Sequence, residues 1–172
     1  MQQYPDSTDR LRGWARGFVR GKTTDTLALL KDLSGSISAW VFYQSRDDEG
    51  TQSPMQTLDR GWGSCRDIAV LFVEAARSLG FGARLVSGYM YNPDFHLRGM
   101  SDRGSTHAWA EVFVPGAGWI TFDPTNRNFG GYNLIPVAVA RNIHQAMPVS
   151  GSFVGMTDAF LGMSVEVQVN AL

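Results

Sequence analysis

The feature that most constrains the fold of this chain is the apolar run Ile68–Leu79, which directly follows the segment Gly61–Asp67. The run is apolar on nearly every side, which predicts a helix buried within a core. Ser64 is a residue type that caps helices, and Asp67 stands where a first-turn carboxylate accepts a free backbone N–H. Gly80 predicts the end of the helix. The remaining elements are therefore expected to cover this helix.

Cys65, the only cysteine of the chain, falls on the first turn of this predicted helix. There the free backbone N–H groups and the positive end of the helix dipole favour a thiolate over a thiol. The small residues Gly61, Gly63 and Ser64 leave the sulfur reachable. A single cysteine is more often a small buried hydrophobe than a reagent, so a reactive role depends on residues further along the chain.

Composition excludes several classes of function. A length of 172 residues, with 44% hydrophobic and 18% charged residues, indicates one globular domain. The net charge is −1 and no run is rich in Lys or Arg, which argues against a nucleic-acid partner. No stretch approaches the roughly 20 apolar residues that span a bilayer, and the N-terminus has no signal-peptide core, so we expect a cytoplasmic protein without membrane contact. One cysteine rules out an internal disulfide and fits a reducing compartment.

Helical patterns occupy the first part of the chain. A short, glycine-interrupted pattern covers residues 7–19, and a stronger one covers residues 24–41. Ser34–Ser36 predicts a break of the stronger pattern into two helices. The same periodicity predicts that Trp40 belongs to the core. Pro54 is expected to begin a further short helix.

Strand patterns occupy the second part of the chain. They cover Ala83–Tyr91, Thr106–Val114, Trp119–Asp123 and Ile135–Ala140, with further candidates at Val149–Val154 and Met163–Val169. Residues 115–118 are a turn, so the strands on either side of it form a hairpin. Helices followed by an antiparallel sheet of four to six strands predict an α+β fold.

Two polar segments are interpreted as loops. In residues 46–53, Asp47, Asp48 and Glu49 do not have the spacing of an EF-hand, so a solvated loop is favoured over a calcium site. Residues 92–105 are a loop of a length that often lines a site, although His96 within it is interpreted as a surface histidine.

His107 and Asp123 lie on the two strands of the predicted hairpin. If paired residue numbers sum to 230 the two residues are directly opposite, and if they sum to 232 they are diagonal neighbours on one face. In either register the imidazole can bond the carboxylate, which fixes its tautomer and steadies the imidazolium. Cys65, on a helix packed against this sheet, then supplies a nucleophile that the imidazole activates.

Each of these residues also has a structural interpretation. A histidine on a strand is more often a satisfied polar residue than a catalyst, and an aspartate before a proline is a common strand terminator. One cysteine without paired histidines disfavours a zinc site, so no metal and no cofactor are expected.

Four motifs together resemble the transglutaminase-like superfamily, in its bacterial cysteine-peptidase branch. They are Gly63–Asp67, Ala83–Tyr89, His107–Val112 and Gly118–Thr125, and the similarity runs from about Ile37 to the C-terminus. The resemblance implies a papain-like core, a triad of Cys65, His107 and Asp123, and acyl transfer through a thioester. All three positions of the triad are intact, which disfavours an inactive homologue. Gly82 stands where the family usually has proline.

From these observations we expect residues 1–172 to form a single domain, with a helical extension over 1–36 and a catalytic core over 37–172. The expected partner is a peptide or protein amide, and hydrolysis as a peptidase or amidase is the first choice. The alternatives are protein-glutamine gamma-glutamyl transfer, acyl transfer of the arylamine type, and peptide binding without catalysis.

The expected oxyanion donors are the Cys65 backbone N–H and a second group. The indole N–H groups of Trp40 and Trp62 are candidates for that second donor. Trp109 is expected to wall the cleft or to belong to the core, and the same holds for Trp119 and Tyr89.

Overall fold

The computed structural model describes residues 3–4, 8–21, 23–46, 50–91, 103–147, 149, 151–152, 154–156, 158–162 and 164–169. The helices are α1 (Arg10–Arg16), α2 (Thr26–Trp40), α3 (Pro54–Arg60), α4 (Cys65–Ser78) and the 3-10 helix η2 (Ile143–Ala146). The strands are β1 (Phe42–Tyr43), β2 (Trp62–Gly63), β3 (Ala83–Met90), β4 (Arg103–Val114), β5 (Gly118–Asp123), β6 (Asn128–Phe129), β7 (Leu134–Ala140) and β8 (Val167–Gln168). The predicted α+β class is confirmed.

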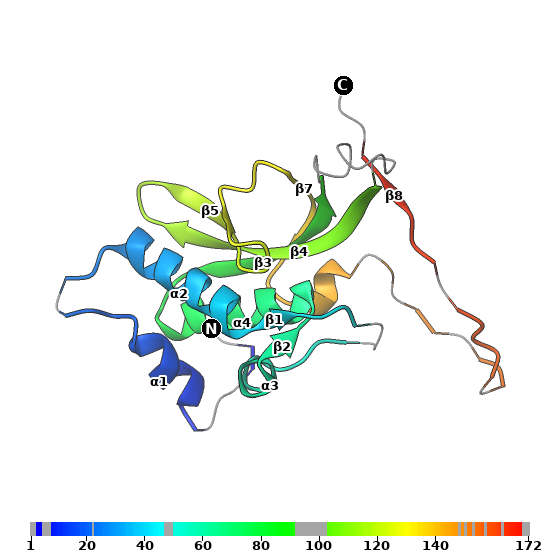
Figure 1. Cartoon of the computed structure of the whole chain (residues 1–172), viewed down its shortest axis with the longest axis horizontal. Coiled ribbons are helices and arrows are strands. Elements are labelled where there is room, and N and C mark those ends of the chain that lie inside the picture. Colours follow the sequence, from blue (N-terminus) through cyan, green and yellow to red (C-terminus); the bar gives the residue numbers. More distant parts are fainter. Residues whose placement is uncertain are drawn as a thin grey trace.

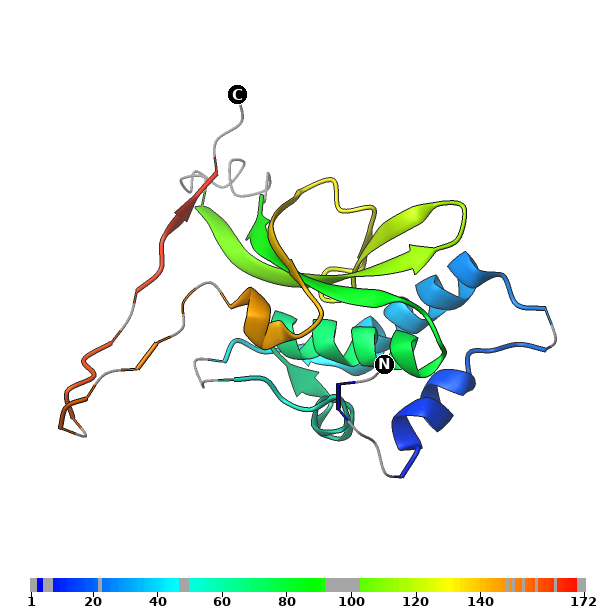
Figure 2. The same ribbon diagram turned by 180° about the vertical axis from the view of Figure 1, so that it is seen from behind.

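The main sheet is antiparallel and has the strand order β6-β5-β4-β3-β7, with β8 paired to the start of β4. A separate parallel pair joins β1 to β2. Helix α4 packs against β3 and β4, and α1, α2 and α3 pack on its other sides (Figure 1). Seen from behind, the same sheet lies along one side of α4 (Figure 2). The cysteine helix is therefore enclosed, as its apolar run predicted.

The core forms where α4 meets the sheet. Phe72 of α4 and Phe122 of β5 are almost fully buried, and their ring centroids lie 5.2 Å apart. Burial of apolar side chains of this size is worth about 1.5–3 kcal/mol each. This packing holds the first turn of α4 at a defined place beside β4 and β5.

The buried helix also carries two charged residues that pair with each other. Arg77 donates to Glu74 Oε1 at 2.6 Å, and its guanidinium also donates to the carbonyls of Ala83 and Arg141. Glu74 Oε2 accepts from the backbone N–H of Gln3 at 2.8 Å. These contacts satisfy both buried charges and connect the end of α4 to β3 and to the chain after β7.

Helix α2 begins as expected and continues further than expected. Asp25 caps it by accepting from the Ala28 N–H at 2.7 Å. The predicted break at 34–36 is wrong, because Leu33 and Ile37 on either side of it are fully buried and tertiary packing outweighs the cost of about 1 kcal/mol for a helical glycine. The core assignment of Trp40 is also wrong, since this residue ends the helix and is 63% exposed.

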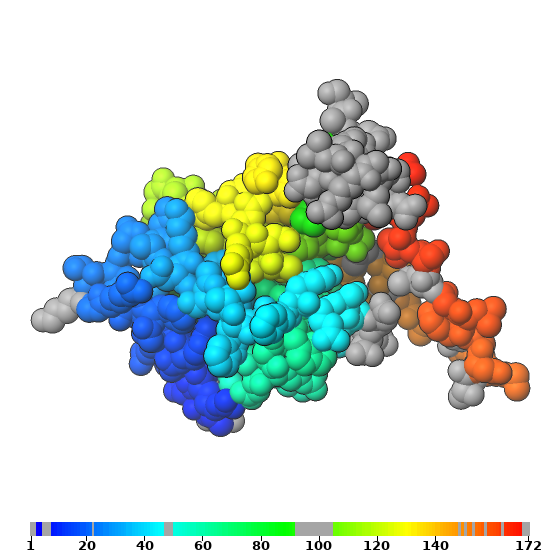
Figure 3. All heavy atoms as spheres, in the orientation of Figure 1, coloured from blue at the N-terminus to red at the C-terminus, as the bar shows by residue number. Residues whose placement is uncertain are grey.

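The strand predictions over β3, β4, β5 and β7 are confirmed, and so is the helix that begins at Pro54. Strand β4 begins at Arg103, so the prediction that residues 103–105 belong to a loop is wrong, and the rest of that predicted loop lies outside the described residues. Further along, none of the described residues between 149 and 154 lies in a strand, and the segment 163–169 contributes only β8. Figure 3 shows this C-terminal part extending away from the body, and β8 then pairs with the start of β4 (Figure 1). The apolar residues of this part are exposed, so the alternating pattern has no core to pack against and does not form a longer strand.

The predictions for Asp47–Glu49 and His96 lie outside the described residues. In the part of the chain that the structure describes, no helix has both the length and the apolarity to cross a membrane.

Candidate active site

The first turn of α4 presents Cys65. The helix starts at this residue, and Ser64 precedes it as N-cap. Asp67 closes the turn by accepting from the Ser64 N–H and from the Ser64 hydroxyl, both at 2.8 Å on Oδ2. Gly63 is needed here because a Cβ at that position would lie 2.8 Å from Asp67 Cβ. The first-turn position of Cys65 is thus confirmed, and its side chain is half-buried.

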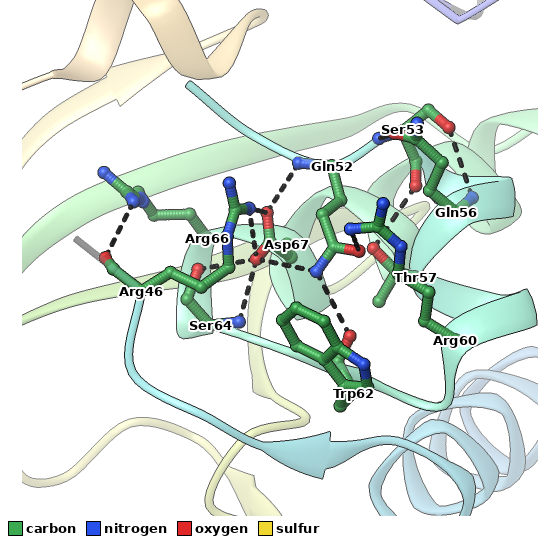
Figure 4. A network of polar contacts seen from close by, with 10 residues as sticks. All are labelled: Arg46, Gln52, Ser53, Gln56, Thr57, Arg60, Trp62, Ser64, Arg66 and Asp67. Atoms are coloured by element: carbon green, nitrogen blue, oxygen red, sulfur yellow. Dashed lines mark hydrogen bonds and ion pairs between the residues drawn. The ribbon is translucent and has the colours of Figure 1, made fainter. Parts of the chain in front are cut away.

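Asp67 also binds the segment that follows β1. Its carboxylate is fully buried and accepts from Arg46 Nη1 at 3.0 Å and from the Gln52 N–H at 2.7 Å (Figure 4). Burial alone raises the pKa of a carboxyl group, but the N–H groups of Ser64 and Gln52, the Ser64 hydroxyl and Arg46 together lower the pKa of Asp67 below 3.8. Asp67 is therefore a buried anion that anchors the nucleophile turn to residues 46–52.

His107 on β4 and Asp123 on β5 meet in the second of the two registers that the hairpin allowed. The pairs Ala110–Phe122 and Glu111–Thr121 sum to 232, so the two residues are diagonal neighbours. His107 Nε2 lies 2.8 Å from Asp123 Oδ2, and both side chains are buried. The hydrogen bond that the even register predicted is present.

The imidazole of His107 also contacts Cys65. Burial lowers the pKa of His107, but hydrogen bonds to Asp123 and to the Cys65 side chain, with the negative charges of both, raise it from 6.5 to about 9. Since Nε2 faces Asp123, Nδ1 is left for the sulfur. A pKa near 9 favours an imidazolium at neutral pH, placed between the Asp123 carboxylate and the Cys65 side chain. The structure thus brings together Cys65, His107 and Asp123.

The three tryptophans of the predicted cleft have different positions. Trp40 donates its indole N–H to the Leu58 carbonyl at 3.1 Å, so in this arrangement it is not an oxyanion donor. Trp62 is half-buried beneath the guanidinium of Arg60, whose central carbon lies 5.5 Å from the ring. Trp109 is buried and stacks with His107 at 6.0 Å between ring centroids, so it supports the imidazole from within the core.

The two other residues considered for the cleft lie on β5 and β3, the strands on either side of β4. Trp119, 43% exposed, lies under Arg84 at 3.9 Å and beside Phe113. Tyr89 is 37% exposed on β3, where it pairs with Thr106 in the sheet register. Neither residue has a contact with the imidazole that would make it a wall of this site.

Tyr43 is a residue of the site that sequence reasoning missed. Strand β1 pairs with β2 in the register Tyr43–Gly63, which places Tyr43 next to the turn that carries Cys65. Burial and then the negative charge of Cys65 raise the pKa of the Tyr43 phenol, so the two groups are close enough to interact. A strand of two residues has no periodicity, so no sequence pattern could have identified it. Asn126, whose side chain reaches both Asp123 and His107, was missed as well.

No other feature of the described residues competes with this site. They contain no group of three or more His, Cys, Asp or Glu side chains arranged to hold a metal ion. A hollow of about 630 Å³ lies at the opposite end of α4, between Arg12, Arg16 and Leu79, away from the first turn.

Comparison with known sequences identifies similar proteins. The model of the transglutaminase-like superfamily matches residues 12–124. An uncharacterized protein of Mycobacterium leprae is 31% identical over 115 residues, covering 67% of this chain and 40% of that protein. A protein-glutamine gamma-glutamyltransferase of Pseudomonas aeruginosa is 29% identical over 93 residues, covering 52% of this chain and 13% of that protein.

Solved structures show the same similarity. A Cytophaga hutchinsonii protein that was assigned as a cysteine protease aligns with a TM-score of 0.65 and 27% identity, covering 83% of this chain and 47% of that one. The periplasmic domain of TgpA from Pseudomonas aeruginosa aligns with a TM-score of 0.55 and 25% identity, covering 73% of this chain and 45% of that one. Legionella pneumophila LapG, at 15% identity and a TM-score of 0.55, shares the fold. This chain therefore spans less than half of the Mycobacterium and Cytophaga proteins.

Proposed function

Because the chain belongs to the transglutaminase-like superfamily, we propose that it transfers acyl groups from amide or peptide substrates through a thioester on Cys65. The observation that carries this proposal is the contact of one imidazole with both the Asp123 carboxylate and the Cys65 side chain. A thiol activated by an adjacent base, with a third group that orients the base, is the general arrangement of a covalent catalyst. In the proposed site these roles belong to Cys65, His107 and Asp123.

The first half of the proposed cycle forms the thioester. The Cys65 thiolate attacks the substrate carbonyl, a C–S bond forms, and the electron pair of the C=O moves to oxygen. When that pair returns, the C–N bond breaks and His107 gives its Nδ1 proton to the leaving amine. The neutral ring then keeps its proton on Nε2, facing Asp123 Oδ2 at 2.8 Å.

The second half releases the acyl group. Water, deprotonated by Nδ1, attacks the thioester, the C–S bond breaks, and the thiolate and imidazolium are restored. We propose hydrolysis as the main outcome, with water as acceptor. Transfer to an amine of a second substrate is the alternative, favoured by the similarity to the Pseudomonas aeruginosa gamma-glutamyltransferase.

Two donors are proposed for the oxyanion. One is the Cys65 backbone N–H, because the first four N–H groups of a helix have no partner within it. The other is the Tyr43 hydroxyl, because β1 pairs Tyr43 with Gly63, two residues before Cys65, and the negative charge of Cys65 raises the pKa of the phenol. Trp40 is not proposed, since its N–H is bonded to Leu58.

The proposal is tested with a library of quenched peptides, incubated with and without a primary amine. We expect cleavage without the amine, and we expect Cys65→Ala to abolish it with an unchanged circular dichroism spectrum. Asp59→Asn, on the exposed face of α3, is the matched control and should cleave normally. A Cys65→Ala variant that still cleaves would rule out the covalent route.

The same assay separates the alternatives. Product joined to the amine in place of cleavage would indicate cross-linking, and labelling of Cys65 by acetyl-CoA would indicate the arylamine type. Binding of peptides by wild type and Cys65→Ala alike, without turnover, would indicate a binding module. Iodoacetamide labelling adds an independent check. A cysteine paired with an imidazolium should already be labelled at its maximal rate near pH 7, whereas the labelling rate of a free thiol rises only as the pH approaches about 8.5.

A further inference from the structure

The side chain of Asn126 lies between the imidazole and the carboxylate of the site. Its Nδ2 is 2.8 Å from Asp123 Oδ2, 3.2 Å from His107 Nε2 and 3.4 Å from Met90 Sδ. Asn126 itself is exposed, so the amide fills no space in the core. These contacts are directed at the polar atoms of the site.

The chemistry of the partners decides how the amide is oriented. An ionised carboxylate oxygen only accepts hydrogen bonds, so the atom of Asn126 that faces Asp123 Oδ2 is the nitrogen. Its second hydrogen points to the sulfur of Met90, a weak acceptor. Because both hydrogens of the amide are engaged, the 3.2 Å between Asn126 Nδ2 and His107 Nε2 is not a hydrogen bond. The two nitrogens are both donors, and they share Asp123 Oδ2 as acceptor.

Both oxygens of Asp123 are consequently held in place. Oδ1 accepts from the backbone N–H of Thr125 at 3.1 Å and from that of Asn126 at 3.4 Å, which fixes the turn after β5. Oδ2 accepts from His107 and from the Asn126 amide. The carboxylate has no freedom to rotate without losing one of these donors.

We propose that Asn126 is a positioning residue that holds Asp123 Oδ2 against His107, so that Nε2 keeps its proton and Nδ1 stays turned to Cys65. This inference rests on the proposed function for its catalytic meaning. A neutral ring with the proton on Nδ1 could neither accept the proton of the attacking water nor bond to Asp123. Asn126 thus acts through Asp123 and has no contact with the reacting atoms.

The first test follows the tautomer of the ring and needs no turnover. In the Cys65→Ala chain, nitrogen-detected NMR at a pH where His107 is neutral should show the proton on Nε2. Adding Asn126→Ala should reduce the Nε2–H population and speed its exchange with water. Asn128→Ala is the matched control, because Asn128 starts β6 just after this turn and its amide donates to Asn133 instead, and it should leave the tautomer unchanged.

The second test uses the substrate found for the wild-type chain. Asn126→Ala should lower kcat by roughly ten-fold while KM stays within about two-fold, as for residues that orient a catalytic side chain. Asn126→Asp keeps the size of the side chain but faces His107 Nε2–H with a second carboxylate, so it should shift the protonation midpoint of His107 upward. This variant tests the same contact between residue 126 and His107 if Asn126→Ala does not fold.

The outcomes are separable from those of the proposed function. Loss of the Nε2–H tautomer in Asn126→Ala supports the positioning role even if no substrate is cleaved. An unchanged tautomer, an unchanged His107 midpoint in Asn126→Asp, or an equal effect of Asn128→Ala would overturn it, whatever the activity. A fall in kcat with an unchanged tautomer would also overturn it.

Discussion

Replacing Asp67 with asparagine is the perturbation whose cost the structure defines best. The carboxylate accepts from the Ser64 N–H and hydroxyl, from the Gln52 N–H and from Arg46 Nη1, at 2.7 to 3.0 Å. Asparagine has nearly the same shape but only one accepting oxygen. Its NH₂ group would face donors wherever the second carboxylate oxygen now lies.

The magnitude follows from these contacts. Two or more hydrogen bonds lose their acceptor, and bonds to a charged group are worth about 1.5–3 kcal/mol each. Arg46, whose side chain is only 10% exposed, keeps its charge without the anion it pairs with here. Breaking a buried pair from one side typically costs about 3–5 kcal/mol. We therefore expect Asp67→Asn to lower the free energy of unfolding by about 3–5 kcal/mol.

Urea unfolding followed by tryptophan fluorescence measures this loss. Asp59→Asn is the matched control, because Asp59 also pairs with an arginine, Arg10, at 2.7 Å, but both side chains are more than half exposed. Such a pair is worth about 0–1 kcal/mol. Equal small losses for the two variants would refute the reasoning that the Asp67 network stabilises the first turn of α4.

Acid adds a second check on the charge of Asp67. Its pKa lies below 3.8 in the folded chain, so its stabilising contribution is complete above that value and is lost as the pH falls through the folded pKa. The stability difference between wild type and Asp67→Asn should therefore shrink in strong acid. A difference that stays constant there would show that shape, and not charge, causes the loss.

Three further predictions concern other parts of the chain. The NMR titration of the His107 ring should have its midpoint near 9 and a lower midpoint in Asp123→Asn, and a wild-type value near 6.5 would contradict the ion pair. Gly88→Ala should destabilise the chain by more than about 2 kcal/mol in urea, because its Cβ would meet the Ile135 carbonyl and Trp109, whereas Gly13→Ala in α1 meets nothing within 4 Å and should stabilise by about 0.5–1 kcal/mol. Tyr43→Phe should lower kcat about 100-fold if its hydroxyl is an oxyanion donor, with iodoacetamide labelling unchanged, and an unaltered kcat would exclude that role.

Local signals explain which parts of the fold were predictable. The caps at Asp25 and Ser64 and the proline that starts α3 act over three or four residues, so the sequence shows them directly. The break predicted near Gly35 failed for the opposite reason. Whether a weak helical residue interrupts a helix depends on what packs around it, and here the buried neighbours come from α4.

The part of the site that depends on the alternation of side chains along a strand could be predicted from the sequence. Alternation alone places His107 and Asp123 on one face in either even register, but the choice of 232 over 230 depends on the geometry of the turn at 115–118. Tyr43 and Asn126 could not be predicted as residues of the site. Strand β1 is too short to show a sequence pattern, and residues in the turn after β5 do not alternate in a regular way. The single-domain boundaries and the cytoplasmic location remain predictions.

The Asp67 network also bears on the proposed chemistry, because Asp67 and Cys65 share one turn of α4. A buried carboxylate so near the sulfur would by itself oppose a negative charge there. Arg46 offsets that charge at 3.0 Å, and the hydrogen bonds from Ser64 and Gln52 disperse it further. The positive end of the helix and the imidazolium of His107, which Asp123 pairs with on its other side, then remain to favour a negative charge on Cys65. In the proposed mechanism the residues that stabilise the turn also allow the thiolate of Cys65 to form, so the proposed activity and the stability of this turn should fall together when the network is broken.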